Sequence, residues 1–66
     1  MYVKLTATLQ APVDSASLFN EVEEYDVNVS DFIHCVYVYG TVNIFHIDTV
    51  ITILLKYGAE EIKIKK

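Results

Sequence analysis

The feature that most constrains this chain is the stretch Val36–Asn43, whose sequence is VYVYGTVN. Valine and tyrosine alternate through its first half, and both residue types favour β-strands. The stretch predicts a strand from residue 32 or 33 to Tyr39 with apolar side chains on both faces. Gly40 then closes the strand or permits a tight bend, and Asn43 is a typical first residue of a helix. Such a strand raises the question of what covers its second face.

Two segments in the first half of the chain have clear periodicity. Residues 1–9 alternate strictly between apolar and polar side chains, which predicts a strand with one buried side that ends at Gln10-Ala11-Pro12. From Asp14 or Ser15, either of which suits a helix N-cap, apolar residues recur at spacings of three and four as far as Tyr25. We therefore expect an amphipathic helix there, followed by a short strand over residues 26–30.

The segment after Gly40 admits two interpretations. In one, Asn43 caps a long helix whose inward side chains are Ile44, Ile47, Ile51, Leu54 and Leu55. In the other, Gly40 and Thr41 turn a hairpin and a shorter helix begins at Asp48. The spacing of three and four favours the long helix, although its β-branched residues lower helix propensity. Gly58 suits the residue just after a helix, and alternation predicts a last strand over residues 61–65.

The predicted order of elements is β-α-β-β-α-β within a single domain of residues 1–66. Right-handed crossovers then place two helices on one face of a four-stranded antiparallel sheet, so we expect a ferredoxin-like α+β fold of two layers. The second half, from Val36–Asn43 through Lys56-Tyr57-Gly58 to the last strand, resembles heavy-metal-associated domains and small regulatory domains of the same plan. The metal-binding family carries two cysteines between its first strand and first helix. Residues 10–14 contain none, so metal carriage does not follow from the resemblance.

In this plan the first and third strands lie in the centre of the sheet, and the last strand lies beside the first. Alternation then divides the strand residues between two faces. The side chains expected beneath the helices are Val3, Leu5, Ala7, Leu9, Val36, Val38, Ile62 and Ile64. Those expected on the uncovered face are Tyr2, Lys4, Thr6, Thr8, Cys35, Tyr37, Tyr39, Lys63 and Lys65. The opposite assignment, with Tyr37 and Tyr39 buried, stays open because the third strand is apolar on both faces.

Composition and charge narrow the function classes. The chain is 53% hydrophobic, and a domain of this size often needs a partner to bury its apolar surface. Its single cysteine cannot form an internal disulfide and suits a reducing compartment, so we expect a cytoplasmic location. No apolar run is long enough for a membrane span, and no membrane partner is expected. A net charge of −4 without arginine argues against nucleic acid as a partner.

The only candidates for a catalytic or metal site are His34, Cys35, His46 and Asp48. His34 and Cys35 are successive residues of a predicted strand, so their side chains should leave opposite faces. His46 and Asp48 are two residues apart, which separates them on a helix. The chain has only two glycines and no phosphate-binding loop. We therefore expect no enzyme activity, no metal and no cofactor.

The uncovered face is the predicted functional surface, and a second copy that forms a homodimer is the simplest protein partner. The expected contact residues are Tyr2, Lys4, Thr6, Cys35, Tyr37, Tyr39 and Lys63. Three alternatives are single-stranded nucleic acid on the tyrosines and lysines, a small ligand at a dimer seam, and inhibition of a nucleic-acid enzyme by Glu21, Glu23 and Glu24. A further interpretation is that tyrosine and threonine are present only because they form strands well.

Overall fold

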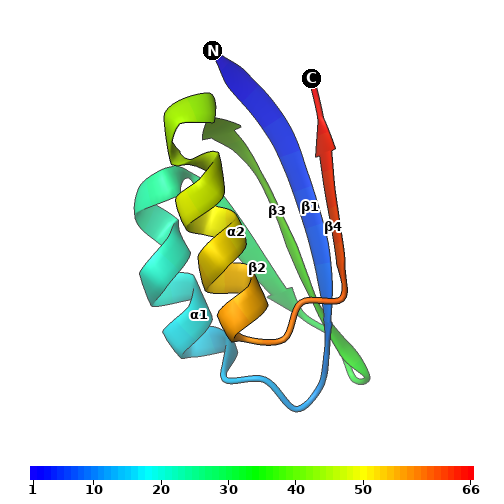
Figure 1. The fold of residues 1–66 in the computed structure, drawn as a ribbon. Helices are drawn as coiled ribbons and strands as arrows, with labels where there is room; N and C mark the ends of the chain where they lie inside the picture. Colours follow the sequence, from blue (N-terminus) through cyan, green and yellow to red (C-terminus); the bar gives the residue numbers. More distant parts are fainter.

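The computed structural model describes residues 1–66 and has an α+β architecture, with one open four-stranded antiparallel sheet and two helices (Figure 1). The strands are β1 (Tyr2–Gln10), β2 (Val27–Asp31), β3 (Cys35–Asn43) and β4 (Glu61–Lys65), and the helices are α1 (Ser15–Val22) and α2 (Ile47–Lys56). Two short 3₁₀ turns, η1 (Glu23–Tyr25) and η2 (Ile44–His46), follow α1 and precede α2. Both helices lie on the same side of the sheet, and no other segment covers the opposite side (Figure 1).

The strands are arranged in the order β2-β3-β1-β4, and each neighbouring pair is antiparallel. The first and third strands therefore occupy the centre and the last strand lies beside the first, as predicted. β1 and β3 pair along their whole lengths, from Tyr2 opposite Asn43 to Gln10 opposite Cys35. β2 and β4 are edge strands of five residues each. The long central pair thus supplies most of the surface on both faces.

The side chains beneath the helices are those that alternation predicted for the two central strands. The buried core comprises Val3, Leu5, Ala7, Leu9, Leu18, Val22, Val27, Val36, Val38, Val42, Val50 and Leu54. Because the valines of β3 are inside, Tyr37 and Tyr39 face outward. At β4 the prediction is only partly correct, since Ile62 is half-buried and Ile64 is 46% exposed. An edge strand has a neighbour on one side only, so its side chains receive less cover.

β3 differs from its predicted boundaries at both ends. It begins at Cys35 because residues 32–34 form the β2–β3 turn, in which the Phe32 amide donates a hydrogen bond to the Cys35 carbonyl. It continues through Gly40 to Asn43, so the glycine lies inside the strand rather than at its end. A Cβ atom on Gly40 would lie 2.5 Å from the Asp26 carbonyl oxygen. Close approach of the segment that leads into β2, rather than a turn, requires glycine here.

The start of the second helix lies between the two predictions. The Asn43 side chain accepts a hydrogen bond from the Phe45 amide at 3.0 Å and so caps the η2 turn, after which α2 begins at Ile47. A 3₁₀ turn advances about 120° per residue, against about 100° in an α-helix, so residues in the turn point in other directions than a continuous α-helix predicts. The prediction that Ile44 points inward is therefore wrong, and this side chain is exposed.

The buried stripe of α2 is narrower than predicted. Val50 and Leu54 are fully buried, while Ile47 and Ile51 are half-buried at its margins. Leu55, which was expected inside, is 58% exposed. The apolar residues of this helix are so numerous that spacing alone does not single out the side that faces the sheet.

The start of α1 and the end of α2 follow the predicted capping signals. The Asp14 carboxylate accepts hydrogen bonds from the Ser17 amide and hydroxyl at 3.1 and 2.8 Å, which caps α1. After α2, Gly58 has a φ of +92°, and the amides of residues 58 and 59 donate to carbonyls of the last helical turn. This is the Schellman arrangement, in which glycine avoids the steric cost of a left-handed conformation. α1 itself ends at Val22, earlier than predicted, and η1 completes the segment to Tyr25.

Candidate association surface on the open sheet face

The open face of the sheet carries a pair of tyrosines near its centre. The Tyr37 and Tyr39 rings stack with their centroids 5.6 Å apart and their planes 27° apart. The two side chains are 38% and 40% exposed, respectively. Their cross-strand neighbours are short: Tyr37 lies opposite Thr8 and Ser30, and Tyr39 lies opposite Thr6 and Asn28. The rings therefore stand above the residues on either side and form a ridge along β3.

The strand register brings most of the predicted contact residues into one central group. Thr6 lies opposite Tyr39 on one side and opposite Lys63 on the other, and Lys4 is the next residue of β1 on this face. Tyr37 extends the group along β3. These five residues span three adjacent strands without a break.

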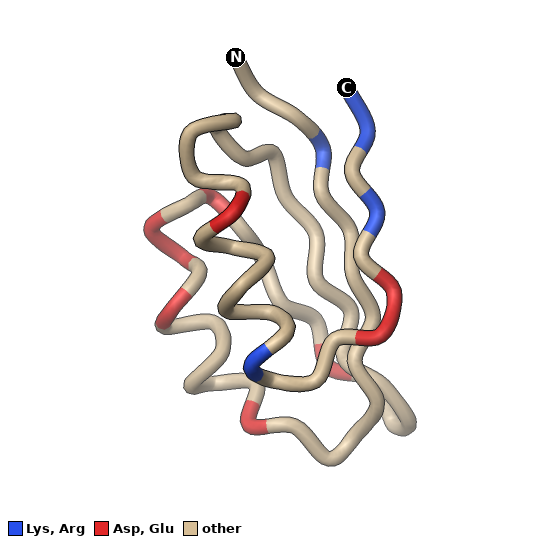
Figure 2. The backbone as a smooth tube through the Cα atoms, viewed as in Figure 1, with Lys and Arg blue, Asp and Glu red and all other residues tan.

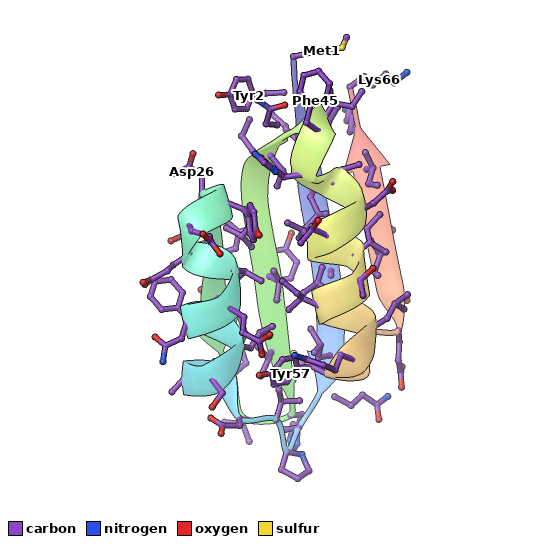
Figure 3. The ribbon with its side chains drawn as sticks, turned by 60° about the vertical axis from the view of Figure 1, so that its left-hand side comes forward. Met1, Tyr2, Asp26, Phe45, Tyr57 and Lys66 are labelled. Atoms are coloured by element: carbon purple, nitrogen blue, oxygen red, sulfur yellow. The ribbon has the colours of Figure 1, made fainter.

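The remaining two predicted residues do not belong to that group. Tyr2 pairs with Asn43 and Cys35 pairs with Gln10, at opposite ends of the β1–β3 ladder. Eight residue steps separate these ends, which corresponds to about 27 Å along the strands. Figure 3 shows Tyr2 at the end of the molecule where Phe45 and Lys66 also lie. One compact contact site cannot include all seven residues, whereas a flat protein interface can.

Charge is distributed unevenly along the open face. Lys4, Lys63 and Lys65 lie toward the end of the sheet where the two chain termini lie, and Lys4 is directly opposite Lys65. Glu60 and Glu61 lie at the other end of β4 (Figure 2). The only ion pair in the molecule joins two helical residues, so none of these lysines is neutralised within the chain. The face is thus basic at one end and acidic at the other.

The acidic end of the face contains a hollow of about 520 Å³. The side chains that line it are Thr8, Gln10, His34, Cys35, Glu60 and Glu61. Within it, Gln10 Nε2 donates a hydrogen bond to Glu60 Oε2 at 3.3 Å, and the Glu60 amide bonds to the Thr8 carbonyl at 3.1 Å. A smaller hollow of about 200 Å³ adjoins Lys4 and Tyr39. Both hollows open to solvent on the face that the helices leave uncovered.

The structure corrects the prediction that His34 and Cys35 point to opposite faces. His34 precedes β3 and lies in the turn, so strand alternation does not apply to it, and both residues line the same hollow. No group of three or more His, Cys, Asp or Glu side chains is arranged to hold a metal ion. His46 lies elsewhere, in η2, with its ring 5.3 Å from the Tyr25 ring.

A second polar cluster, which the sequence did not indicate, joins the two helices. From the sequence, Glu21 was one of the three glutamates considered as an inhibitory surface. In the structure its Oε1 accepts a hydrogen bond from Lys56 Nζ at 2.6 Å, and its Oε2 accepts one from the Tyr57 hydroxyl. Figure 3 shows Tyr57 between the helices. The three residues come from segments 35 residues apart, so no local pattern links them.

These hydrogen bonds shift two ionisation equilibria. The Lys56 and Tyr57 hydrogen bonds lower the pKa of Glu21 below its ordinary value of 4.5. The bond to Glu21 raises the pKa of Tyr57 above 10.0, because a nearby carboxylate disfavours the tyrosinate anion. The cluster is polar and partly exposed, and it lies away from the open sheet face.

Comparisons of the chain with protein-family models, with curated proteins and with solved structures yield no match. Neither helix of the structure has the length and apolar character needed to cross a bilayer.

Proposed function

We propose that the chain is a non-enzymatic, cytoplasmic protein-association module with a ferredoxin-like fold, and that its open sheet face binds a second copy. The strand order β2-β3-β1-β4 with both helices on one face supports the ferredoxin-like assignment. The single thiol supports the cytoplasmic location.

The observation that carries the proposal is the stacked pair of Tyr37 and Tyr39 on a face that nothing covers. Tyrosine is enriched at protein interfaces because its ring buries apolar area while its hydroxyl keeps a hydrogen-bond partner. Threonine side chains border the ridge on the β1 side, so a partner surface can approach the rings closely. A twofold dimer needs one self-complementary patch, and a flat sheet face meets that requirement.

The size of the face suits a modest interface. The molecule measures 33 × 20 × 17 Å, so the sheet side presents on the order of 600 Å² in projection. Specific interfaces bury about 800 Å² per partner, and smaller ones are usually transient. We therefore expect dimerisation in the micromolar range rather than a permanent complex.

Sedimentation equilibrium over a wide range of protein concentration tests the proposal, with Tyr37→Lys as the disruptive variant. A charge at the centre of the interface should abolish the dimer while circular dichroism shows the same folded state. The matched control is Asn20→Lys, which makes the same charge change on exposed α1 and should leave the dimer intact. A wild-type chain that stays monomeric at millimolar concentration contradicts the proposal, as does a dimer that tolerates Tyr37→Lys.

A second candidate is single-stranded nucleic acid, because stacked aromatic rings and unpaired lysines share one face. The acidic end of the same face opposes it, since phosphates bind to clustered cations. Titration with an oligonucleotide at low salt distinguishes the two: tyrosine fluorescence that is quenched, and recovers with salt, would favour nucleic acid. The acidic-inhibitor alternative is weaker, because Lys56 and Tyr57 already engage Glu21.

A further inference from the structure

We propose that the second copy binds in antiparallel orientation, with the twofold axis crossing the strands between Tyr37 and Tyr39. This inference rests on the proposed association through the open face, and it adds the contacts that set the orientation. Its basis is the placement of cations and anions along β4 relative to the tyrosine ridge on β3.

The strand register arranges the open face in rows that run across the sheet. One row contains Lys63, Thr6, Tyr39 and Asn28, and the next contains Glu61, Thr8, Tyr37 and Ser30. A twofold axis that lies between these rows and parallel to them exchanges the two rows. Each row of one protomer then faces the other row of the second copy.

Every pair that this axis creates is chemically compatible. Tyr37 of each protomer faces Tyr39 of the second copy, which extends the stacking already present within the chain. Lys63 faces Glu61 of the second copy. Lys65 lies one row further out and faces the position of Ala59 of the second copy, which adjoins Glu60 in the hollow. The twofold symmetry makes each of these contacts twice.

The hollow at the acidic end gives the lysines a place to bind. Its volume of about 520 Å³ is enough for the end of a lysine side chain, and Glu60 and Glu61 line it. Lys63 and Lys65 have no ion-pair partner within their own chain. Aligned sheets pack about 30° apart, and the length of lysine side chains accommodates that rotation.

The other axis that lies in the face, parallel to the strands, gives poorer contacts. It places β4 over β2 and β3 over β1 of the second copy. The tyrosines would then face Thr6 and Thr8, while Lys63 would face Asn28 and Glu61 would face Ser30, so neither charge would meet an opposite one. The hollow at Glu60 and Glu61 would receive no cation from the second copy's β4.

A charge-swap experiment tests the orientation. Lys63→Glu and Glu61→Lys each replace two attractive contacts by two repulsive ones, so each should weaken the dimer about tenfold at low salt. The double variant carrying both substitutions restores opposite charges and should dimerise within about threefold of the wild type. The two single variants, when mixed, should form a heterodimer in preference to either homodimer, because both contacts are then attractive.

The design separates this orientation from general charge effects and from the proposed function. Lys63→Glu makes the acidic chain more acidic and Glu61→Lys makes it less so, yet both should weaken the dimer. Glu24→Lys changes the net charge as Glu61→Lys does but lies in η1, and it should leave the dissociation constant unchanged. If Tyr37→Lys dissociates the dimer but the double swap does not restore affinity, the orientation is wrong and the proposed function stands. A monomeric wild type overturns both.

Discussion

Gly40 and Gly58 show that the same residue type meets two different requirements. Gly40 has an ordinary strand backbone. A side chain is excluded there by neighbouring atoms, because the carbonyl of Asp26 and the backbone of Val27 occupy the space that a Cβ atom would need. At Gly58 the surroundings are empty within 4 Å, and the constraint is the left-handed backbone itself. Substitution therefore has a different cost at each position.

We expect Gly40→Ala to lower the free energy of unfolding by about 3 kcal/mol, since the clash is with backbone and requires the η1–β2 connection to move. Gly58→Ala should cost about 1 kcal/mol, the penalty of a left-handed conformation for an L-residue with free space around it. Urea denaturation followed by circular dichroism measures both. Equal costs for the two variants would contradict the close approach at Gly40.

The contact of Glu21 with Tyr57 should make stability depend on pH at both extremes. Glu21 has a lowered pKa when folded, so its contribution is present above 4.5 and is lost as the pH falls through the lowered value. Tyr57 has a raised pKa when folded, so its contribution is present below 10.0 and is lost as the pH rises through the raised value. The contribution of the cluster is therefore constant between about pH 5 and 9.

Spectrophotometric titration of the tyrosines tests this contact. One of the five tyrosines should ionise at higher pH than an ordinary side chain, and Glu21→Gln should lower that pKa because the carboxylate charge is removed. Tyr57→Phe, the control, should eliminate the late transition altogether. A late transition that survives Glu21→Gln unchanged would show that the carboxylate is not its cause.

At the scale of elements, adjacent residues of α2 test the position of its buried face. Leu54→Ala should cost about 3 kcal/mol, because the side chain is fully buried in the core and its loss leaves a cavity. Leu55→Ala makes the same chemical change on an exposed side chain and should cost less than about 1 kcal/mol. Thermal and urea unfolding measure the difference. A larger cost at Leu55 would mean that the helix is rotated about its axis.

Local signals predicted element types better than element ends. The alternation in β1 and β4, the Asp14 cap and the Gly58 terminus all depend on neighbours in sequence, and the structure contains each of them. The boundaries of β3 depend instead on contacts with β1 and with the segment before β2. Those contacts join residues far apart in the chain, so no local pattern marked where the strand begins or why it passes through Gly40.

At the scale of the whole molecule, association should couple stability to concentration. If the dimer forms as proposed, the urea midpoint of the wild type should rise with protein concentration, because the folded dimer is favoured by mass action. At a protein concentration about one hundred times the dissociation constant, association adds up to about 2.7 kcal/mol to the free energy of unfolding. Tyr37→Lys should unfold at a midpoint independent of concentration. A wild-type midpoint that does not move would contradict the association.

The sequence by itself determined the α+β class, the β-α-β-β-α-β order of elements, the capping region of the first helix and the glycine terminus of the second, because periodicity and capping are interactions among neighbouring residues. It also predicted which residues of the central strands face outward, but it left the opposite assignment open, since β3 is apolar on both sides. Only the tertiary structure decided that question, by burying the valines beneath α1 and α2. It also decided that Lys63 shares a row with Thr6 and Tyr39 and that Glu61 shares one with Thr8 and Tyr37, because strand register, which sets those rows, is a property of the folded sheet.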